Sequence, residues 1–195
     1  LAYFHRYNFL PEIPGEVRFN ASLIESGDGF LLSFRNSWRD SRLYVAWLTK
    51  DFQPTGKWKK LEFPGRWKGH EDGRFFRHNG ALWIAFVGFT GFETSVLYAK
   101  LNEQTMEVDQ SFWPQYMMRN KHEKSWSMFS HEGQLHAIYS TQPHSVITFT
   151  EPGEGEDPYV EKAHSTPFTG EWTGGPLRGG ASPVLVGEEW WHWIH

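Results

Sequence analysis

The stretch NGALWIAF, residues 79–86, joins a turn dipeptide to a run of apolar residues. An Asn-Gly dipeptide between two apolar segments is the strongest short-range signal for a β-hairpin. The apolar segment before this turn is Arg74–Phe76. The same pattern recurs as DGFLLSF (residues 28–34), EGQLHAIY (132–139) and GEEWWHWI (187–194). The four copies predict a hairpin that repeats along the chain.

The spacing of the copies indicates the size of the repeating unit. The turn glycines fall at positions 29, 80, 133 and 187, so the period is 51 to 54 residues. A third apolar strand is predicted after each of the first three hairpins, at residues 41–48, 95–101 and, more weakly, 145–149. A unit of about fifty residues with three or four antiparallel strands is typical of a propeller blade. We therefore predict an all-β fold, a β-propeller, with residues 1–195 forming one domain.

The fourth copy ends at His195 after two predicted strands, so we expect about three and a half blades. Propellers hide their sheet edges by closing radially. We expect the missing strands to come from further sequence or from a partner subunit, which makes a homo-oligomer one option. The alternative fold is an open β-sandwich whose turns share this spacing by coincidence.

The bulk composition limits the possible partners. The net charge of −4 gives no electrostatic reason to expect nucleic acid or an anionic membrane as a partner. There is no cysteine, which excludes disulfides and thiol catalysis. Together with a start, LAYFHRY, that lacks a signal-peptide pattern, this favours a cytoplasmic protein. The aromatic content of 17% suits sugar binding, and it equally suits the filling of space between blades.

Polar residues stand at the start of each copy, just before the innermost strand. Because innermost strands line the channel of a propeller, we expect these residues to converge in one pocket. Such a pocket suits a polyhydroxylated or phosphorylated ligand. The segments are Asn20-Ala21-Ser22, Glu71-Asp72-Gly73-Arg74, Lys124-Ser125-Trp126-Ser127 and residues 178–183. Arg35 and Arg39 flank the end of an apolar strand and are further candidates to reach the channel.

These segments resemble motifs of a known family. Residues 71–75, EDGRF, are similar to the Glu-Asp-Pro-Arg motif of five-bladed propeller glycosidases, the mannoside phosphorylases and related enzymes of glycoside hydrolase family 130. NAS (20–22), KSW (124–126) and GGASPV (179–184) are similar to that family's Asn-Pro-Ser, Lys-Asn-Trp and Gly-rich Pro-Pro segments. Gly73 and Ala21 replace prolines of the motifs. The resemblance implies a five-bladed propeller that cleaves a mannoside-like glycosidic bond with inversion, by phosphorolysis or hydrolysis.

The resemblance also implies roles for individual residues. Asp72 would be the general acid, and Lys124, Arg178 and His195 would bind phosphate. The remaining positions would contact an oligosaccharide or other small-molecule substrate: Asn20, Ser22, Glu71, Arg74, Trp126 and His144, the last in place of an arginine of the family. No cofactor and no metal are expected, with inorganic phosphate as a possible co-substrate.

Two other functions remain open. A sugar-binding propeller without turnover, associated with glycan synthesis, would have the same aromatic pocket. A protein-interaction propeller is disfavoured because its Gly-His and Trp-Asp signatures are missing. Hydrolysis by water would need a second carboxylate as base, and none is evident in the other blade-start segments. That favours phosphate as the nucleophile, or no catalysis.

Overall fold

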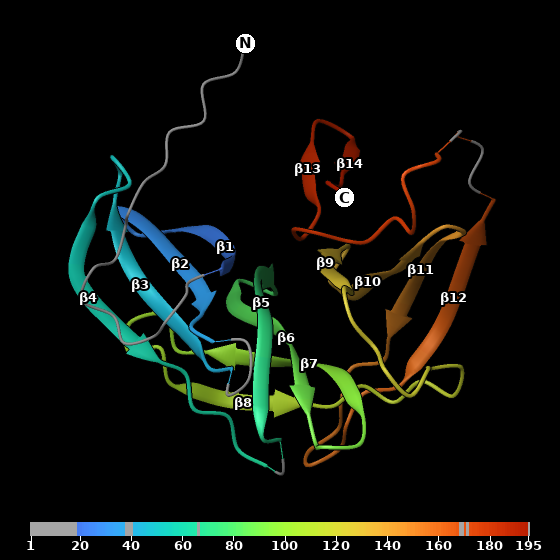
Figure 1. Cartoon of the computed structure of the whole chain (residues 1–195), viewed down its shortest axis with the longest axis horizontal. Coiled ribbons are helices and arrows are strands. Elements are labelled where there is room, and N and C mark those ends of the chain that lie inside the picture. The colour runs from blue at the N-terminus through green and yellow to red at the C-terminus, as the bar shows by residue number, and fades with distance from the viewer. Residues whose placement is uncertain (1–18, 38–40, 66, 168–169, 171, 195) are drawn as a thin grey trace.

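The computed structural model describes residues 19–37, 41–65, 67–167, 170 and 172–194. Every regular element within these residues is a strand (Figure 1). The strands form three antiparallel four-stranded sheets and one two-stranded hairpin. No helix of the described chain is long and apolar enough to cross a membrane.

Each four-stranded sheet follows chain order, as in a propeller blade. Blade 1 contains β1 (Phe19–Ser26), β2 (Gly29–Arg35), β3 (Leu43–Thr49) and β4 (Pro54–Lys60). Blade 2 contains β5 (Gly69–His78), β6 (Ala81–Phe89), β7 (Thr94–Leu101) and β8 (Val108–Phe112). Blade 3 contains β9 (Ser127–His131), β10 (Gln134–Thr141), β11 (His144–Phe149) and β12 (Val160–Thr166). The terminal hairpin consists of β13 (Val184–Val186) and β14 (Glu189–Trp191).

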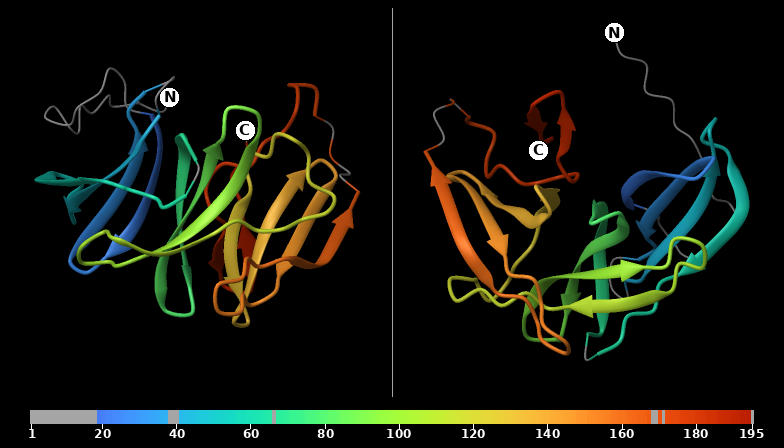
Figure 2. Two further views of the ribbon diagram at one scale, coloured as in Figure 1. Left: turned by 90° about the horizontal axis from the view of Figure 1, so that it is seen from below. Right: turned by 180° about the vertical axis from the view of Figure 1, so that it is seen from behind.

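The sheets stand around a common centre with their first strands innermost. Strand β1 lies against β5, and β5 lies against β9. The views in Figures 1 and 2 show the blades side by side in an arc, with the hairpin beyond blade 3. The prediction of an all-β propeller with about three and a half blades is confirmed.

Blade 2 is packed on both faces because neighbouring blades cover them. Side chains of a strand alternate between its two faces. In β6, Ile84 and Phe86 join the cluster shared with blade 1, which includes Leu31 and Leu43. The intervening residues, such as Trp83, join the second cluster, shared with blade 3. The inner strands are thus held in place by two apolar interfaces, one on each side of blade 2.

The hairpin turns carry the backbone geometry that the sequence predicts. Asn79 and Gly80 have φ values of 48° and 73°, the two positive angles of a type I′ turn. In blade 1 the predicted turn glycine was wrong by two residues, because the turn is Gly27-Asp28 and Gly29 begins β2. Gly29 is still required, since a Cβ there would lie 2.1 Å from the carbonyl oxygen of Leu48 on β3.

The outermost strands were not predicted. Strands β4, β8 and β12 lie within residues 51–65, 102–114 and 151–170, polar or Pro/Gly-rich stretches that follow the third predicted strand of each copy and were expected only to lead to the next copy. None of the three has a fully buried residue, and β4 and β12 are mostly exposed. A strand with one solvated face and one solvated edge needs little apolar sequence, which explains why it escapes a pattern based on apolar runs.

Candidate functional site

Three residues at the starts of the inner strands adopt a left-handed backbone. Asn20, Asp72 and Ser125 have φ values of 53°, 54° and 63°. In blades 1 and 2 the strand register shifts at this point, between Phe19 and Ser22 and between Glu71 and Arg74. Bulges of this kind re-aim side chains and are common beside functional sites. The left-handed conformation thus recurs at the start of the inner strand in each of the three four-stranded blades.

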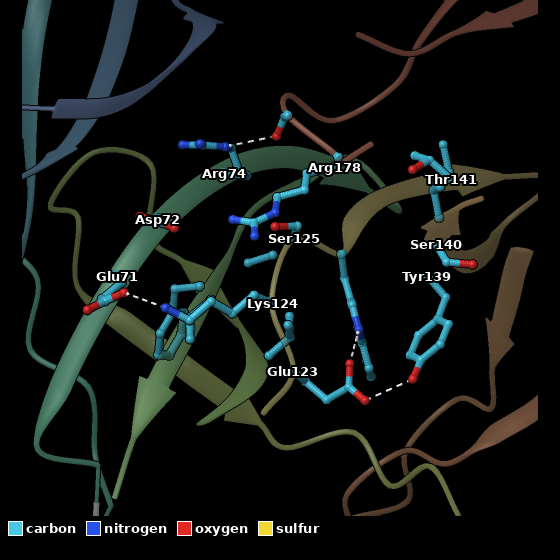
Figure 3. Close-up of a pocket in the computed structure, with 18 of the residues that line it drawn as sticks. Glu71, Asp72, Arg74, Glu123, Lys124, Ser125, Tyr139, Ser140, Thr141 and Arg178 are labelled. Carbon is cyan, nitrogen blue, oxygen red and sulfur yellow. Dashed lines mark hydrogen bonds and ion pairs between the residues drawn. The ribbon is translucent and has the colours of Figure 1, made fainter. Parts of the chain in front are cut away.

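The three left-handed residues sit at one cavity of about 650 Å³, a size typical of small-molecule sites. Figure 3 shows that side chains from blades 2 and 3 and from the segment before β13 point into it. Its polar lining includes Asn20, Arg35, Glu71, Asp72, Arg74, Glu123, Lys124, Ser125, Tyr139 and Arg178. The predicted convergence of the blade-start segments is therefore observed for residues of all four copies.

The acid pair of blade 2 is held by cations from blades 1 and 3. Glu71 Oε2 lies 3.0 Å from Arg35 NH1 and 3.2 Å from Lys124 Nζ. Asp72 Oδ1 accepts a hydrogen bond from Asn20 Nδ2 and lies 3.4 Å from Arg35 Nε. Arg35 is 7% exposed, so its charge is balanced chiefly by these two carboxylates. Residues from three blades thus form one wall of the cavity, which carries both positive and negative charges.

Arg74 contacts backbone rather than a carboxylate. Its Nε donates to the carbonyl of Gly180 at 2.9 Å, and its NH1 donates to the carbonyl of Asn20 at 2.8 Å. Burial lowers the pKa of this guanidinium from its ordinary value. Arg74 therefore links the inner strand of blade 2 to blade 1 and to the segment before β13 (Figure 3).

Blade 3 supplies an aromatic wall around a buried carboxylate. Glu123 accepts hydrogen bonds from Tyr139 Oη at 2.8 Å, from Trp126 Nε1 at 3.0 Å and from the backbone N–H of Asn120. Burial and the bond to Glu123 raise the pKa of Tyr139. Neither Glu123 nor Tyr139 was predicted from the sequence as a site residue. Glu123 adjoins Lys124, but nothing in its spacing shows that it turns toward a tyrosine at the end of β10.

The other predicted residues have different placements. Arg178 reaches the cavity (Figure 3), and within the described residues its guanidinium makes no hydrogen bond or ion pair. Ser22 Oγ accepts the backbone N–H of Phe75 at 3.0 Å and is outside the lining. His144 begins β11, also outside the lining. His195 and Arg39 lie outside the described residues.

A metal site finds no support in the described part of the chain. No group of three or more His, Asp or Glu side chains there is arranged to hold an ion. The cations of Arg35, Lys124 and Arg178 already supply positive charge at the cavity. The arrangement suits hydroxyl groups, which can donate to the carboxylates, and anions, which can accept from the guanidinium groups and the ammonium group.

Comparisons with known proteins show the fold. No protein-family model matches the chain, and no curated protein matches its sequence. Similar solved structures include RS223 β-xylosidase (15% identity, TM-score 0.56, covering 91% of this chain and 64% of that one). A GH43 β-xylosidase/α-arabinofuranosidase from a compost microbial metagenome has 12% identity and a TM-score of 0.56, over 91% of this chain and 64% of that one. Arabinanase Arb43A from Bacillus subtilis has 13% identity and a TM-score of 0.54, over 88% of this chain and 65% of that one.

These structures define the class of fold as a β-propeller of the kind found in glycosidases. The chain spans slightly less than two thirds of their length. None of these three structures is described as a mannoside phosphorylase. The structural similarity therefore supports the propeller fold and does not extend to family 130 in particular.

Proposed function

We propose that this chain forms the substrate pocket of a carbohydrate-active enzyme that cleaves a glycosidic bond. The observation that carries the proposal is the acid pair Glu71 and Asp72 on a left-handed bulge, which lines one cavity together with its ion-pair partners Arg35 and Lys124. Carboxylates flanking a sugar-sized cavity are the groups that glycoside cleavage uses. The fold shared with structures named as xylosidases and an arabinanase supports the same class.

The proposed mechanism proceeds with inversion. Asp72, when protonated, donates its proton to the leaving glycosidic oxygen as the bond from that oxygen to the anomeric carbon breaks. Phosphate or water attacks the same carbon from the opposite face. Lys124 and Arg178 would hold a phosphate, and Arg178 has no protein partner among the described residues that would compete. For water as the nucleophile, a lining carboxylate other than Asp72 would take its proton.

The proposed substrate is a mannoside-like oligosaccharide, with inorganic phosphate as co-substrate. The support for mannose is the resemblance of EDGRF and the other blade-start segments to the mannoside phosphorylases. The structural neighbours add xylosides and arabinofuranosides to the substrates that deserve testing.

A second candidate function is sugar binding without turnover. One observation favours it: Asp72 Oδ1 is an acceptor for Asn20 and faces Arg35, whereas a general acid must present a proton. In this function Asp72 would accept hydrogen bonds from sugar hydroxyls and would not transfer a proton.

An assay with an Asp72→Asn variant separates the two functions. Release of sugar and sugar 1-phosphate is measured from mannosides, xylosides and arabinofuranosides, with and without phosphate. The enzyme proposal expects turnover that falls by roughly 100-fold or more in the variant, the usual contribution of a general acid. Asp109→Asn, an exposed residue on β8, is the matched control and should retain turnover. Sugar binding without turnover by the wild type would support the second candidate.

A further inference from the structure

We infer that Glu123 is a positioning residue that fixes the Tyr139 ring as the wall against which a sugar ring stacks. The inference rests on the proposed carbohydrate site and adds the aromatic subsite to it.

The carboxylate of Glu123 is buried and lacks a cation. Its residue is 5% exposed, and it makes no ion pair within the described residues. Three neutral donors compensate the charge: the Tyr139 hydroxyl, the Trp126 indole N–H and the Asn120 backbone N–H. Hydrogen bonds to an ionised acceptor are about twice as strong as neutral ones. Glu123 therefore holds two aromatic side chains and the loop before β9 in one arrangement.

Tyr139 is constrained at its hydroxyl and at its ring. The hydroxyl donates to Glu123 and accepts from Asn120 Nδ2 at 3.2 Å. The ring meets Tyr116 edge-on at 5.1 Å and Trp126 at 5.5 Å. Both hydrogen bonds act at the far end of the ring and so fix its direction, and Figure 3 shows the bond to Glu123.

Of the aromatic residues Phe86, Trp126 and Tyr139 at the cavity, Tyr139 presents the most surface, and Phe86 is only 1% exposed. Trp126, for which the family resemblance implied a substrate contact, is 4% exposed and packs against Phe149. Tyr139 is partly exposed and lines the cavity. An aromatic side chain offers a large apolar surface at low conformational cost, and the apolar faces of a pyranose or furanose fit such a surface. The expected ligand is therefore a neutral sugar ring, with its hydroxyl groups directed toward Glu71 and Asp72.

The test compares sugar binding to the full chain and to two single variants by calorimetry. Mannobiose and xylotriose are titrated into wild type, Glu123→Gln and Tyr139→Phe. In Glu123→Gln the amide has one oxygen, so it cannot accept hydrogen bonds on both sides, from the Trp126 indole and from the Tyr139 hydroxyl. Tyr139→Phe keeps the aromatic ring but loses both hydrogen bonds of the hydroxyl group. We expect roughly tenfold weaker binding in each variant, the effect of losing one hydrogen bond to a charged group. Glu103→Gln removes a carboxylate that Arg77 and Ser26 hold outside the cavity, and it should bind as wild type does.

A spectroscopic readout distinguishes positioning from general damage. In Glu123→Gln we expect the indole N–H resonance of Trp126 to shift, because its carboxylate acceptor is gone, while the other tryptophan resonances stay in place. Equal sugar affinity in wild type and Tyr139→Phe would overturn the positioning role and leave the proposed function intact. Absence of any sugar binding by wild type would overturn both. If Glu123→Gln fails to fold, Tyr139→Phe alone decides.

Discussion

Single residues of this protein reach the cavity because the backbone takes an uncommon conformation. Asn20, Asp72 and Ser125 lie in the left-handed region, which costs a non-glycine residue about 1 kcal/mol or more. Asn and Asp tolerate it best, since their short side chains form local hydrogen bonds. Phe52, Asn79, Met106 and Glu132 share this conformation outside the cavity lining, so it is the repetition at the inner-strand starts of three blades that links it to the site.

Another residue-scale feature concerns His70, which is buried between aromatic rings. It is 6% exposed, its ring lies 4.8 Å from that of Phe63 and 5.5 Å from that of Phe86, and neither ring nitrogen has a hydrogen-bond partner among the described residues. Burial, with a further contribution from nearby Arg42, lowers the pKa of His70 from 6.5 to about 4. The folded protein therefore keeps His70 neutral.

This predicts how stability depends on pH. Above pH 6.5 both folded and unfolded states hold His70 neutral; between 6.5 and about 4 only the unfolded state takes up the proton. As the pH is lowered from 6.5 to about 4, the free energy of unfolding should therefore decrease, and His70 should account for about 3 kcal/mol of that decrease. His70→Phe should lose less stability than wild type between pH 7 and 4.5 in urea unfolding. Parallel pH profiles for the two proteins would contradict the assignment.

The residues of the site were only partly predictable from the sequence. Glu71, Asp72, Lys124 and Arg178 repeat at blade spacing, so their convergence follows from the propeller fold alone. Tyr139 ends the third copy of the repeat and Glu123 directly precedes the segment that starts at Lys124, but neither position in the repeat indicates a contact between them. Their contact depends on the path of the loop before β9, which no periodic pattern encodes.

At the scale of strands, side-chain hydrogen bonds connect the inner strands of neighbouring blades. Ser22 on β1 accepts from the backbone of Phe75 on β5, and Arg74 donates to carbonyls of Asn20 and Gly180. Buried carbonyls without donors are costly, so these links hold the register between blades.

Replacement of Arg74 should weaken the whole fold. Arg74→Met keeps the apolar stem but removes both donors, and we expect a loss of about 2 kcal/mol in the free energy of unfolding. Urea unfolding with an unchanged m-value measures it. Arg178→Met, which removes an arginine without a partner among the described residues, is the control and should change stability little. Equal losses in the two variants would show that the backbone contacts of Arg74 do not stabilise the fold.

The strands differ in how well they could be predicted from the sequence. Strands β2, β6 and β10 follow turn signals and are apolar because blades cover them, so their existence was predictable. The outer strands β4 and β12 are polar and exposed, and no rule based on apolar alternation identifies them. Only their place in the blade, as the fourth strand of a repeated unit, suggests them.

At the scale of the whole molecule, the terminal hairpin exposes apolar side chains. One face contacts blade 3 through Trp190 and Phe129, 4.8 Å apart. Elsewhere on the hairpin Val184, Val186 and Trp191 are 46%, 54% and 51% exposed. Grouped apolar exposure of this kind marks an interaction surface or a site of aggregation.

This predicts self-association of the chain in solution. The wild type should sediment with a concentration-dependent increase in mass, because association buries the hairpin's apolar surface. A Val184→Thr, Val186→Thr, Trp191→Ser variant should shift toward the monomer in analytical ultracentrifugation. A wild type that stays monomeric at every concentration would show that this surface does not drive association.

The central claim is that the cavity at the centre of the blades binds a carbohydrate beside Asp72. A crystal structure of the full chain with Asp72→Asn, soaked with mannobiose or xylotriose above the measured dissociation constant, tests it most directly. We expect a sugar ring against Tyr139, with hydroxyl groups in hydrogen-bonding distance of residue 72 and Glu71. A sugar that binds in solution but lies outside the cavity in the crystal would contradict the account.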